Sequence, residues 1–296
     1  IMALPRINTP KYTLVIPSTQ EEIEYRPYLV KEEKILMMGI ETNDQKQMIT
    51  ALRDVISGCT DGKVNVDKLP MFDMEYIFLK IRAKSVGEIA KIGVKCTSCE
   101  TKNEIEINLD KVKVSGEMKG SEKIQLTDEI GIVLKYPTVK GIKQQLSSKN
   151  DDRDNAMGAV VSSIESIYDK ESVYLAQDET PANLLAFLES LTSTQFVKIS
   201  EYFDDMPKLK HDIDFKCVSC GEDNSVVLEG LQSFFLVCMS HDSLENYYKT
   251  NFSLMQHHKY SLSELDSMIP WEREIYLMLL VQYIKEENDR IKSQNR

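Results

Sequence analysis

The sequence predicts an α+β fold, mainly helical, with a small antiparallel ribbon built from two distant Cys-x-x-Cys knuckles and a helical insertion between them. The first observation behind this prediction is a repeated Lys-Cys-x-Ser-Cys phrase, at 95–99 and again at 216–220. The second is that apolar residues alternate before each phrase, a period that places side chains on one face of a strand. Extended patterns also follow each phrase, so both copies are predicted to fold as strand, knuckle, strand. The third observation is the helical period of most of the remaining sequence.

The two knuckles contain four of the six cysteines, namely Cys96, Cys99, Cys217 and Cys220. Two cysteines separated by two residues at a hairpin tip can bring both sulfurs to one ion at about 2.3 Å, and two such tips complete a tetrahedral zinc site. Four thiolates leave no open position for water or substrate, so the Zn²⁺ of this zinc ribbon is expected to be structural. Iron in the same all-thiolate site stays open as an alternative.

Other interpretations of the cysteines need to be weighed. The pairs are much further apart than the roughly 15–20 residues usual in a ribbon, so either a subdomain is inserted between them or the pairs never meet. A thioredoxin-like motif lies where a strand runs into a helix, whereas strand patterns follow both pairs here. Disulfides would need an oxidising compartment, and no signal peptide is visible. Cys59 and Cys238 are expected to be buried core residues.

Composition and missing motifs restrict the function. The 296 residues carry a net charge of −11, which argues against nucleic-acid binding because that usually requires a basic face. No apolar run reaches the ~18 residues of a membrane span. There is no Gly-rich phosphate loop, Gly-x-Ser-x-Gly elbow or His-Glu-x-x-His motif. His257 and His258 are expected to be solvated, and His211 either packs in the core or lies beside the metal site. We therefore expect a non-enzymatic protein with no small-molecule substrate, nucleic acid or membrane among its partners.

Region 1–87 is predicted to be an N-terminal hairpin followed by helices. Residues 13–26 alternate around a turn and are expected to form the hairpin. Helical periods then run over 29–40 and 48–56. A third helix, over 71–84, is apolar on nearly every side and is therefore expected at the centre of the core.

Region 88–136 is predicted to contain the first half of the zinc ribbon plus further strands. Region 137–207 is predicted to be the helical insertion, in which Thr180-Pro181 forms a strong helix start. One expected helical face of the insertion consists of Val160, Ile164, Ile167 and Tyr168.

Region 208–236 is predicted to be the second half of the ribbon, and region 237–296 a C-terminal helical region. Ser261 begins a capping box with Glu264. The long helix that starts at Pro270 is apolar around much of its circumference, so it must be covered on more than one side. Either this chain covers it as ordinary core or another protein docks there. The predicted partner-binding anchors are Trp271, Tyr276 and Tyr283.

Several short phrases in the first hundred residues point to a known family. They are Ile-Asn-Thr-Pro-Lys-Tyr at 7–12, Ile-Pro-Ser-Thr at 16–19, Tyr-Arg-Pro-Tyr-Leu-Val-Lys-Glu-Glu-Lys at 25–34 and Lys-Ser-Val-Gly-Glu at 84–88. In these phrases the chain resembles the base plate protein family of T4-type tailed phages, whose members are described as baseplate hub subunits or hub assembly proteins. The part beginning near Cys238 is an extension beyond the smaller members.

The resemblance implies a bacteriophage tail protein, either a structural subunit of the baseplate hub or a factor in its assembly. Its partners would be other tail and hub proteins, and its location the host cytoplasm during assembly or the baseplate of the virion. The main alternative is a zinc-ribbon module of a transcription or nucleic-acid complex. A thiol oxidoreductase is a third possibility, which would show reversible oxidation of the cysteine pairs and no metal.

Overall fold

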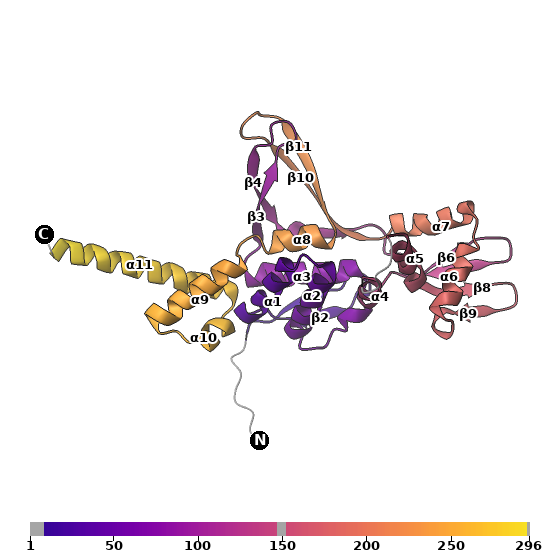
Figure 1. The fold of residues 1–296 in the computed structure, drawn as a ribbon, viewed down its shortest axis with the longest axis horizontal. Coiled ribbons are helices and arrows are strands. Elements are labelled where there is room, and N and C mark those ends of the chain that lie inside the picture. Colours follow the sequence, from indigo (N-terminus) through magenta and orange to yellow (C-terminus); the bar gives the residue numbers. More distant parts are fainter. Residues whose placement is uncertain (1–8, 147–151, 295–296) are drawn as a thin grey trace, which may run out of the picture.

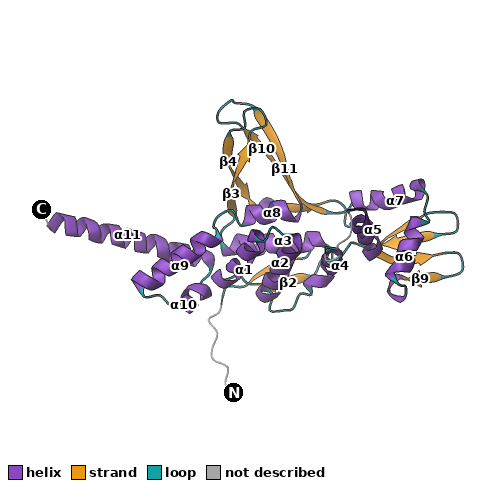
Figure 2. Ribbon diagram, in the orientation of Figure 1, coloured by secondary structure: helices purple, strands orange, loops and turns teal. Residues whose placement is uncertain are grey.

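The computed structural model describes residues 9–146 and 152–294. About half of this chain is helical, and its strands form small antiparallel sheets. Figures 1 and 2 show a central helical body with two hairpins standing on it, an inserted unit at one end and three helices at the other. Mixed helix and strand content was predicted, although helix dominates less than expected.

The elements of the body come from both ends of the sequence. They are β1 (Tyr12–Val15), β2 (Glu22–Tyr25), α1 (Val30–Glu41), α2 (Gln45–Cys59), α3 (Met71–Ser85) and α8 (Gly230–Cys238). Short 3₁₀ turns occur at Val66–Lys68, Leu109–Lys111 and Ala176–Asp178.

Helix α3 lies at the centre of the body, as its sequence predicts. It packs between α2 and α8, and eleven of its fifteen residues are buried. An edge-to-face contact between Phe78 of α3 and Phe235 of α8, with ring centroids 5.7 Å apart, joins the two helices. The predicted hairpin is also confirmed, since β1 and β2 pair antiparallel from Tyr12↔Tyr25 to Val15↔Glu22.

Two separate hairpins carry the knuckles. The first is β3 (Ile89–Lys95) with β4 (Lys102–Asn108), and the second is β10 (Lys208–Lys216) with β11 (Asp223–Glu229). The second hairpin also pairs at its base with β5 (Lys113–Ser115). The two hairpins form separate sheets, because no strand of one pairs with a strand of the other within the described residues. Helix α8 contacts the bases of both hairpins and spaces them, while their tips lean together (Figure 1).

The inserted unit has its own sheet and its own core. Its strands are β6 (Glu122–Gln125), β7 (Gly131–Leu134), β8 (Ile164–Tyr168) and β9 (Val173–Leu175), in the order β6-β7-β8-β9. Its helices are α5 (Asp152–Ser163), α6 (Pro181–Glu189) and α7 (Ser193–Asp204), while α4 (Val139–Gln145) contacts α5 and packs against the core of the body. Ile132, Ile164, Leu188 and Ile199 are among the buried residues of this second core.

A purely helical insertion is therefore a wrong prediction. The expected helical face from Val160 to Tyr168 spans the end of α5 and all of β8. The spacing of these residues is helical, but β-branched and aromatic side chains such as Ile164, Ile167 and Tyr168 also favour strands, and antiparallel pairing with β7 makes this segment a strand. Strands β6 and β7, predicted to belong with the ribbon, pair instead within the insertion. The regional boundaries at 87, 136, 207 and 236 stay a prediction.

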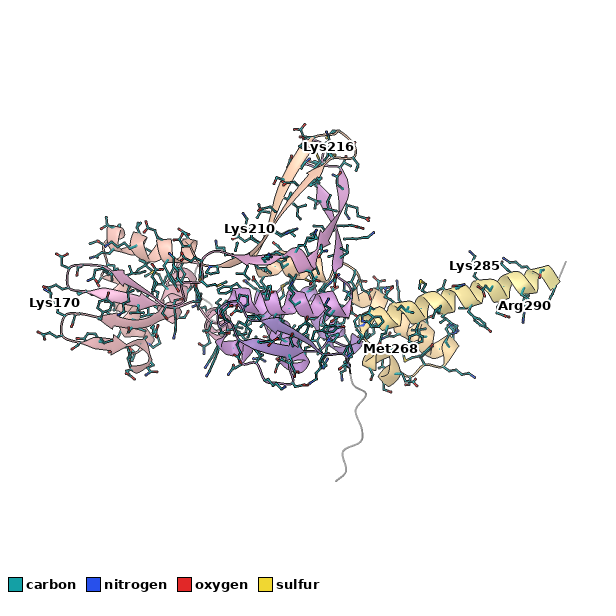
Figure 3. The ribbon with its side chains drawn as sticks, turned by 180° about the vertical axis from the view of Figure 1, so that it is seen from behind. Lys170, Lys210, Lys216, Met268, Lys285 and Arg290 are labelled. Atoms are coloured by element: carbon teal, nitrogen blue, oxygen red, sulfur yellow. The ribbon has the colours of Figure 1, made fainter. Side chains whose placement is uncertain are left out.

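The C-terminal helices are α9 (Leu244–His258), α10 (Leu262–Ser267) and α11 (Pro270–Gln294). The predicted capping box is present, with Ser261 and Glu264 bonded reciprocally. Helices α9 and α10 pack on α1, whereas α11 extends away from the rest of the chain (Figures 1 and 3, where Lys285 and Arg290 mark its distal half). Among the described residues, none of the helices combines the length and the apolar character that a bilayer crossing requires.

Candidate metal centre

The two knuckles have the same backbone geometry. In the first, the amide of Cys96 donates to the carbonyl of Thr101 and the amide of Glu100 donates back to Cys96. In the second, Cys217 bonds in the same way to Glu222 and Gly221. The residue after each second cysteine has a positive φ, 58° at Glu100 and 75° at Gly221. This turn places both cysteines of a pair at the hairpin tip.

The structure brings all four predicted ligands together. The Sγ atoms of Cys96 and Cys220 are 3.7 Å apart, and those of Cys99 and Cys217 are 3.6 Å apart. All four sulfurs lie within 4.8 Å of one another. Four thiolates at about 2.3 Å from a tetrahedral ion are separated by about 3.8 Å from each other. Disulfide sulfurs are separated by only about 2.05 Å, so these are free thiols in an arrangement that suits a metal ion.

Backbone amides around Cys96 and Cys217 favour the thiolate form that a metal requires, whereas the pKa of Cys220 is raised to about 12 beside the neighbouring thiols. The pKa of Cys96 is lowered by the amide hydrogens of Cys99 and Ser98. Those of Cys220 and Ser219 lower the pKa of Cys217 to about 6. Cys96 and Cys217 are buried while Cys99 and Cys220 are exposed, so each knuckle contributes one inner and one outer sulfur.

Two buried asparagines, which the sequence analysis missed, tie the hairpins to each other. Asn224, on the second hairpin, accepts from the amide of Thr97 at 2.9 Å and donates to Cys96 Sγ at 3.5 Å. Asn103, on the first hairpin, accepts from the amide of Val218 at 2.8 Å and donates to Cys217 Sγ at 3.8 Å. Each asparagine therefore holds the knuckle of the opposite hairpin.

A signal for these asparagines is present in the sequence. Both follow the second cysteine of their own pair by four positions, so that Cys-x-x-Cys-x-x-x-Asn occurs twice. Each also donates to a backbone carbonyl of its own turn, Asn103 to Thr101 and Asn224 to Glu222. Extending the comparison of the two copies beyond the cysteines would have revealed the pair.

The histidines lie away from the sulfurs. His211 pairs with Leu228 in the lower part of the β10–β11 hairpin, several residues from the knuckle. His257 and His258 are at the end of α9. His241 instead contacts Glu33 of α1, with 2.7 Å between Nε2 and Oε1. Within the described chain, the cluster that could hold a metal consists of the four cysteines alone.

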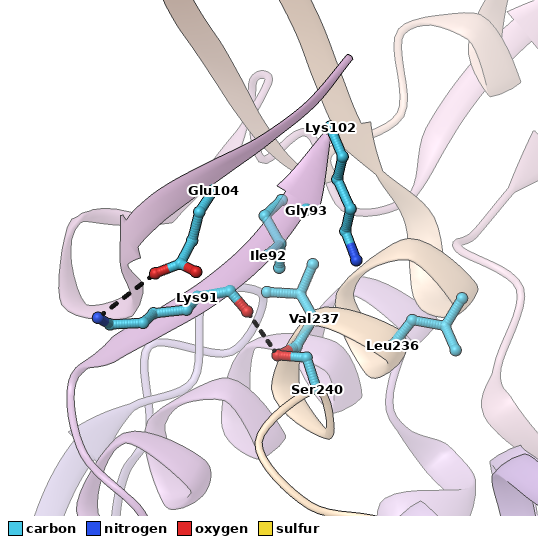
Figure 4. Close-up of a pocket in the computed structure, with 8 residues that line it drawn as sticks. All are labelled: Lys91, Ile92, Gly93, Lys102, Glu104, Leu236, Val237 and Ser240. Atoms are coloured by element: carbon cyan, nitrogen blue, oxygen red, sulfur yellow. Dashed lines mark hydrogen bonds and ion pairs between the residues drawn. The ribbon is translucent and has the colours of Figure 1, made fainter. Parts of the chain in front are cut away.

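A hollow of about 680 Å³ separates the first hairpin from α8 (Figure 4). The Lys102 side chain passes over Gly93, where a Cβ atom would collide with it. Ser240 donates to the carbonyl of Lys91 at 2.9 Å and braces the hairpin against the end of α8. The charged groups of this hollow are Lys91, Lys102 and Glu104, and Lys91 and Glu104 form an ion pair.

The three predicted partner-binding residues lie on α11. Trp271, Tyr276 and Tyr283 are 39%, 53% and 60% exposed. They are accompanied by further exposed apolar residues of the same helix, namely Ile275, Met278, Leu279, Val281 and Ile284. These residues of α11 are therefore not buried in the core of this chain. Binding of a partner to them stays a prediction.

Comparison with known proteins bears on the role of the whole chain. Residues 9–236 match the family model described as T4 bacteriophage base plate protein. Residues 239–285 match the one described as the C-terminal domain of the baseplate hub assembly protein Gp51. No curated protein and no solved structure gives a significant match. Because the first match covers more than half of the sequence, the chain belongs to the T4 bacteriophage base plate protein family.

Proposed function

We propose that the chain is a non-enzymatic protein of the phage baseplate hub, a structural subunit or assembly factor, whose cysteine hairpins are held together by structural Zn²⁺. Membership of the base plate family supports the structural or assembly role, and the second match adds hub assembly. The cluster of four sulfurs supports the metal.

Zinc would be bound by Cys96, Cys99, Cys217 and Cys220. A tetrahedral ion with four thiolate ligands has no open position, so it supplies folding energy and no reaction chemistry. The hairpins stand out from the body and share no sheet, which gives them little else to join their tips. Elemental analysis of protein purified under reducing conditions should find one metal ion per chain. Protein that is folded, reduced and free of metal would refute the zinc proposal, and iron in place of zinc would correct the identity of the ion.

The docking surface in this proposal is the exposed apolar face of α11. A helix that is apolar all round is normally buried, and aromatic side chains such as Trp271, Tyr276 and Tyr283 dominate interface hot spots. The match to the hub assembly domain ends at residue 285, which is also where the helix becomes polar. We infer that another hub or tail protein covers this face.

Two truncations separate docking from folding. Ending the chain after Leu277 removes most of the exposed apolar face but keeps Arg273, which is buried against α1 and α9. Ending it after Lys285 removes only the polar end and serves as the control. The first variant should remain folded and metal-loaded but fail to join hub intermediates in infected cells, while the second assembles normally. Normal assembly of both variants would refute docking through the part of α11 beyond Leu277, because Trp271 and Tyr276 remain in both.

The alternative of a nucleic-acid zinc ribbon is not favoured by the comparisons. Lysines on the hairpins are also neutralised by neighbours, as in Lys91–Glu106 at 3.2 Å and Lys208–Glu229 at 3.2 Å. Nucleic-acid binding depends steeply on salt and is strongest at low salt. A protein that binds no nucleic acid even at low salt would therefore eliminate this alternative. Mass spectrometry of intact virions and of assembly intermediates would decide between hub subunit and assembly factor, and between the virion and the host cytoplasm.

A further inference from the structure

The inserted unit leaves one edge of its sheet open. Strand β9 is the last in the order β6-β7-β8-β9 and, among residues 9–146 and 152–294, pairs only with β8. Its three residues are apolar and exposed, Val173 at 65%, Tyr174 at 46% and Leu175 at 42%. Edge strands present unpaired backbone groups to other chains, and proteins usually protect such edges with charged residues or a covering element.

The opposite edge of the same sheet, strand β6, is protected by charged residues and by a covering helix. Strand β6 has the sequence Glu-Lys-Ile-Gln and lies beside α7. Lys198 of α7 donates to the carbonyl of Gln125 at 2.8 Å. In the part of the chain that the structure describes, no side chain bonds to the backbone of β9 in this way. The difference between the two edges indicates that β9 is open to a partner.

An apolar groove of about 250 Å³ lies next to β9, between the sheet and α6. Small-molecule pockets usually enclose about 300–1,000 Å³, so this groove suits a single side chain better than a whole ligand. Its apolar lining consists of Ile130, Ile167, Tyr168, Tyr174, Leu184 and Phe187. Tyr174 belongs to both features, because it is the middle residue of β9.

The charges around this edge specify the partner. Asp169 and Glu179 lie at the groove, and Asp128, Glu129, Glu171 and Asp178 are exposed nearby in sequence. The cation among them, Lys170, is held by Glu129 at 2.5 Å. A second copy of this chain would bring two acidic edges together, and their charges would repel each other. A basic segment of another protein would instead be attracted by these carboxylates.

We propose that β9 takes up an extended, basic peptide segment of another protein as an added strand, with one apolar side chain of that segment in the adjacent groove. Strand addition gives affinity through main-chain hydrogen bonds and specificity through pockets for alternate side chains. This site is at the opposite end of the molecule from α11, as Lys170 and Arg290 show in Figure 3. The chain would then link two partners, and this surface depends neither on the metal nor on α11.

The test uses the full-length protein and a labelled synthetic peptide, Lys-Val-Lys-Leu-Lys-Val-Lys, with a second peptide that has Glu in place of each Lys. The basic peptide should bind at least about tenfold more tightly than the acidic one, as measured by fluorescence anisotropy. It should also slow hydrogen exchange at the amides of residues 173–175. Tyr174→Lys should weaken this binding by about tenfold or more. The matched control is Val197→Lys, at an exposed apolar position on α7, and it should bind as the unmodified protein does.

Several results would overturn the proposal. They are equal affinity for both peptides, no binding at about millimolar peptide, or protection that appears elsewhere, such as on α11. A concentration-dependent dimer that Tyr174→Lys abolishes would assign β9 to self-association instead. Circular dichroism and metal content of Tyr174→Lys must match those of Val197→Lys, and if they do not, Leu175→Lys takes its place. None of these results would affect the hub assignment, which is tested by the virion and assembly measurements above.

Discussion

Two polar clusters join segments that are far apart in this chain, and they do so in opposite environments. At the hairpin tips, four cysteines and two asparagines meet at the outer end of the molecule. At the junction between α1 and the C-terminal helices, Glu33 contacts His241 at 2.7 Å and Arg273 at 3.6 Å in the buried interior. Asp242 adds a second carboxylate, 3.2 Å from Arg273.

The comparison shows how much each cluster depends on its surroundings. The tip has little apolar packing, so in our proposal its stability comes from a bound ion and from the reciprocal hydrogen bonds. The junction is surrounded by apolar contacts, and a buried ion pair in such a place often adds little net stability beyond that of an apolar replacement. Removing one partner of it is nevertheless costly, because a charge is then left buried without compensation.

The largest effect is expected at the tip. Cys217→Ser should abolish stoichiometric metal binding, because structural zinc sites contribute roughly 10–16 kcal/mol at neutral pH. Hydrogen exchange should become fast in β3, β4, β10 and β11 while α2 and α3 stay protected. Ser219→Ala, in the same knuckle but exposed, is the control and should change neither measurement. A Cys217→Ser protein that keeps its metal and its protected hairpins would contradict the role of the cluster.

At the junction, Arg273→Met should cost about 3–5 kcal/mol, because Asp242 loses its cation and Glu33 keeps only His241 as a partner. Trp271, the only tryptophan, is two residues away on α11, so its fluorescence reports separation of the C-terminal helices during denaturation. Combining Arg273→Met with Glu33→Leu should recover part of that loss, since one of the two carboxylates that faced Arg273 is then replaced by an apolar side chain.

The exposed ion pair of Arg53 with Asp54 provides the junction's control. Arg53→Met should cost less than about 1 kcal/mol, as surface pairs usually do. A double variant at the junction that is less stable than Arg273→Met alone would contradict this view. It would mean that Glu33 stabilises the folded protein even without Arg273.

The difference between the clusters also explains what could be predicted from sequence. The tip was predictable because its four cysteines are marked by residue type and by a spacing of three positions within each pair. The junction was not, because Glu33, Asp242 and Arg273 lie in separate parts of the sequence and resemble any other surface charges there. Strand β8 was missed because tertiary pairing with β7 overrides an ambiguous local pattern. The capping box at Ser261 was correct because its chemistry is local.

Another buried carboxylate, Glu75, sharpens the comparison because no described residue pairs with it. Glu75 of α3 is buried and makes no hydrogen bond or ion pair with another described residue. Burial, with a smaller contribution from Glu229, raises its pKa to about 8 from an ordinary 4.5. Between those values the folded state binds the proton more tightly than the unfolded state, so the free energy of unfolding falls as pH rises from about 4.5 to 8.

Glu75→Gln should remove this part of the pH dependence and stabilise the protein at pH 8 by an amount on the order of 2 kcal/mol. Chemical denaturation at pH 5 and pH 8 measures the difference for both proteins. Glu245→Gln, at an exposed position on α9, is the control and should leave the pH dependence unchanged. An equal pH dependence in Glu75→Gln and the unmodified protein would show that Glu75 is solvated.

The asparagines at the tip should matter less than the cysteines. Asn103→Ala and Asn224→Ala each remove one tie between the hairpins, and loss of such outer contacts typically weakens metal affinity by about 10–100-fold. Because the two sites are equivalent, the two variants should behave alike in competition with a chelator. Asn288→Ala, at an exposed position near the end of α11, should have no effect. If one asparagine variant loses much of its metal affinity and the other loses none, the two hairpins are not equivalent.

The smallest expected effects are at the positions with positive φ, where the two knuckles differ. Gly221 takes the left-handed conformation without strain, at 75°, but Glu100 takes it with a side chain, at 58°. A left-handed conformation costs a residue with a Cβ roughly 1–2 kcal/mol. Gly221→Ala should therefore destabilise the metal-bound protein by about 1 kcal/mol, and Glu100→Gly should stabilise it by somewhat less, because glycine also loses more backbone entropy on folding. Thermal unfolding of both variants with saturating zinc measures these opposite signs. If both substitutions destabilise, the Glu100 side chain makes a contribution at its knuckle that outweighs the strain of its backbone.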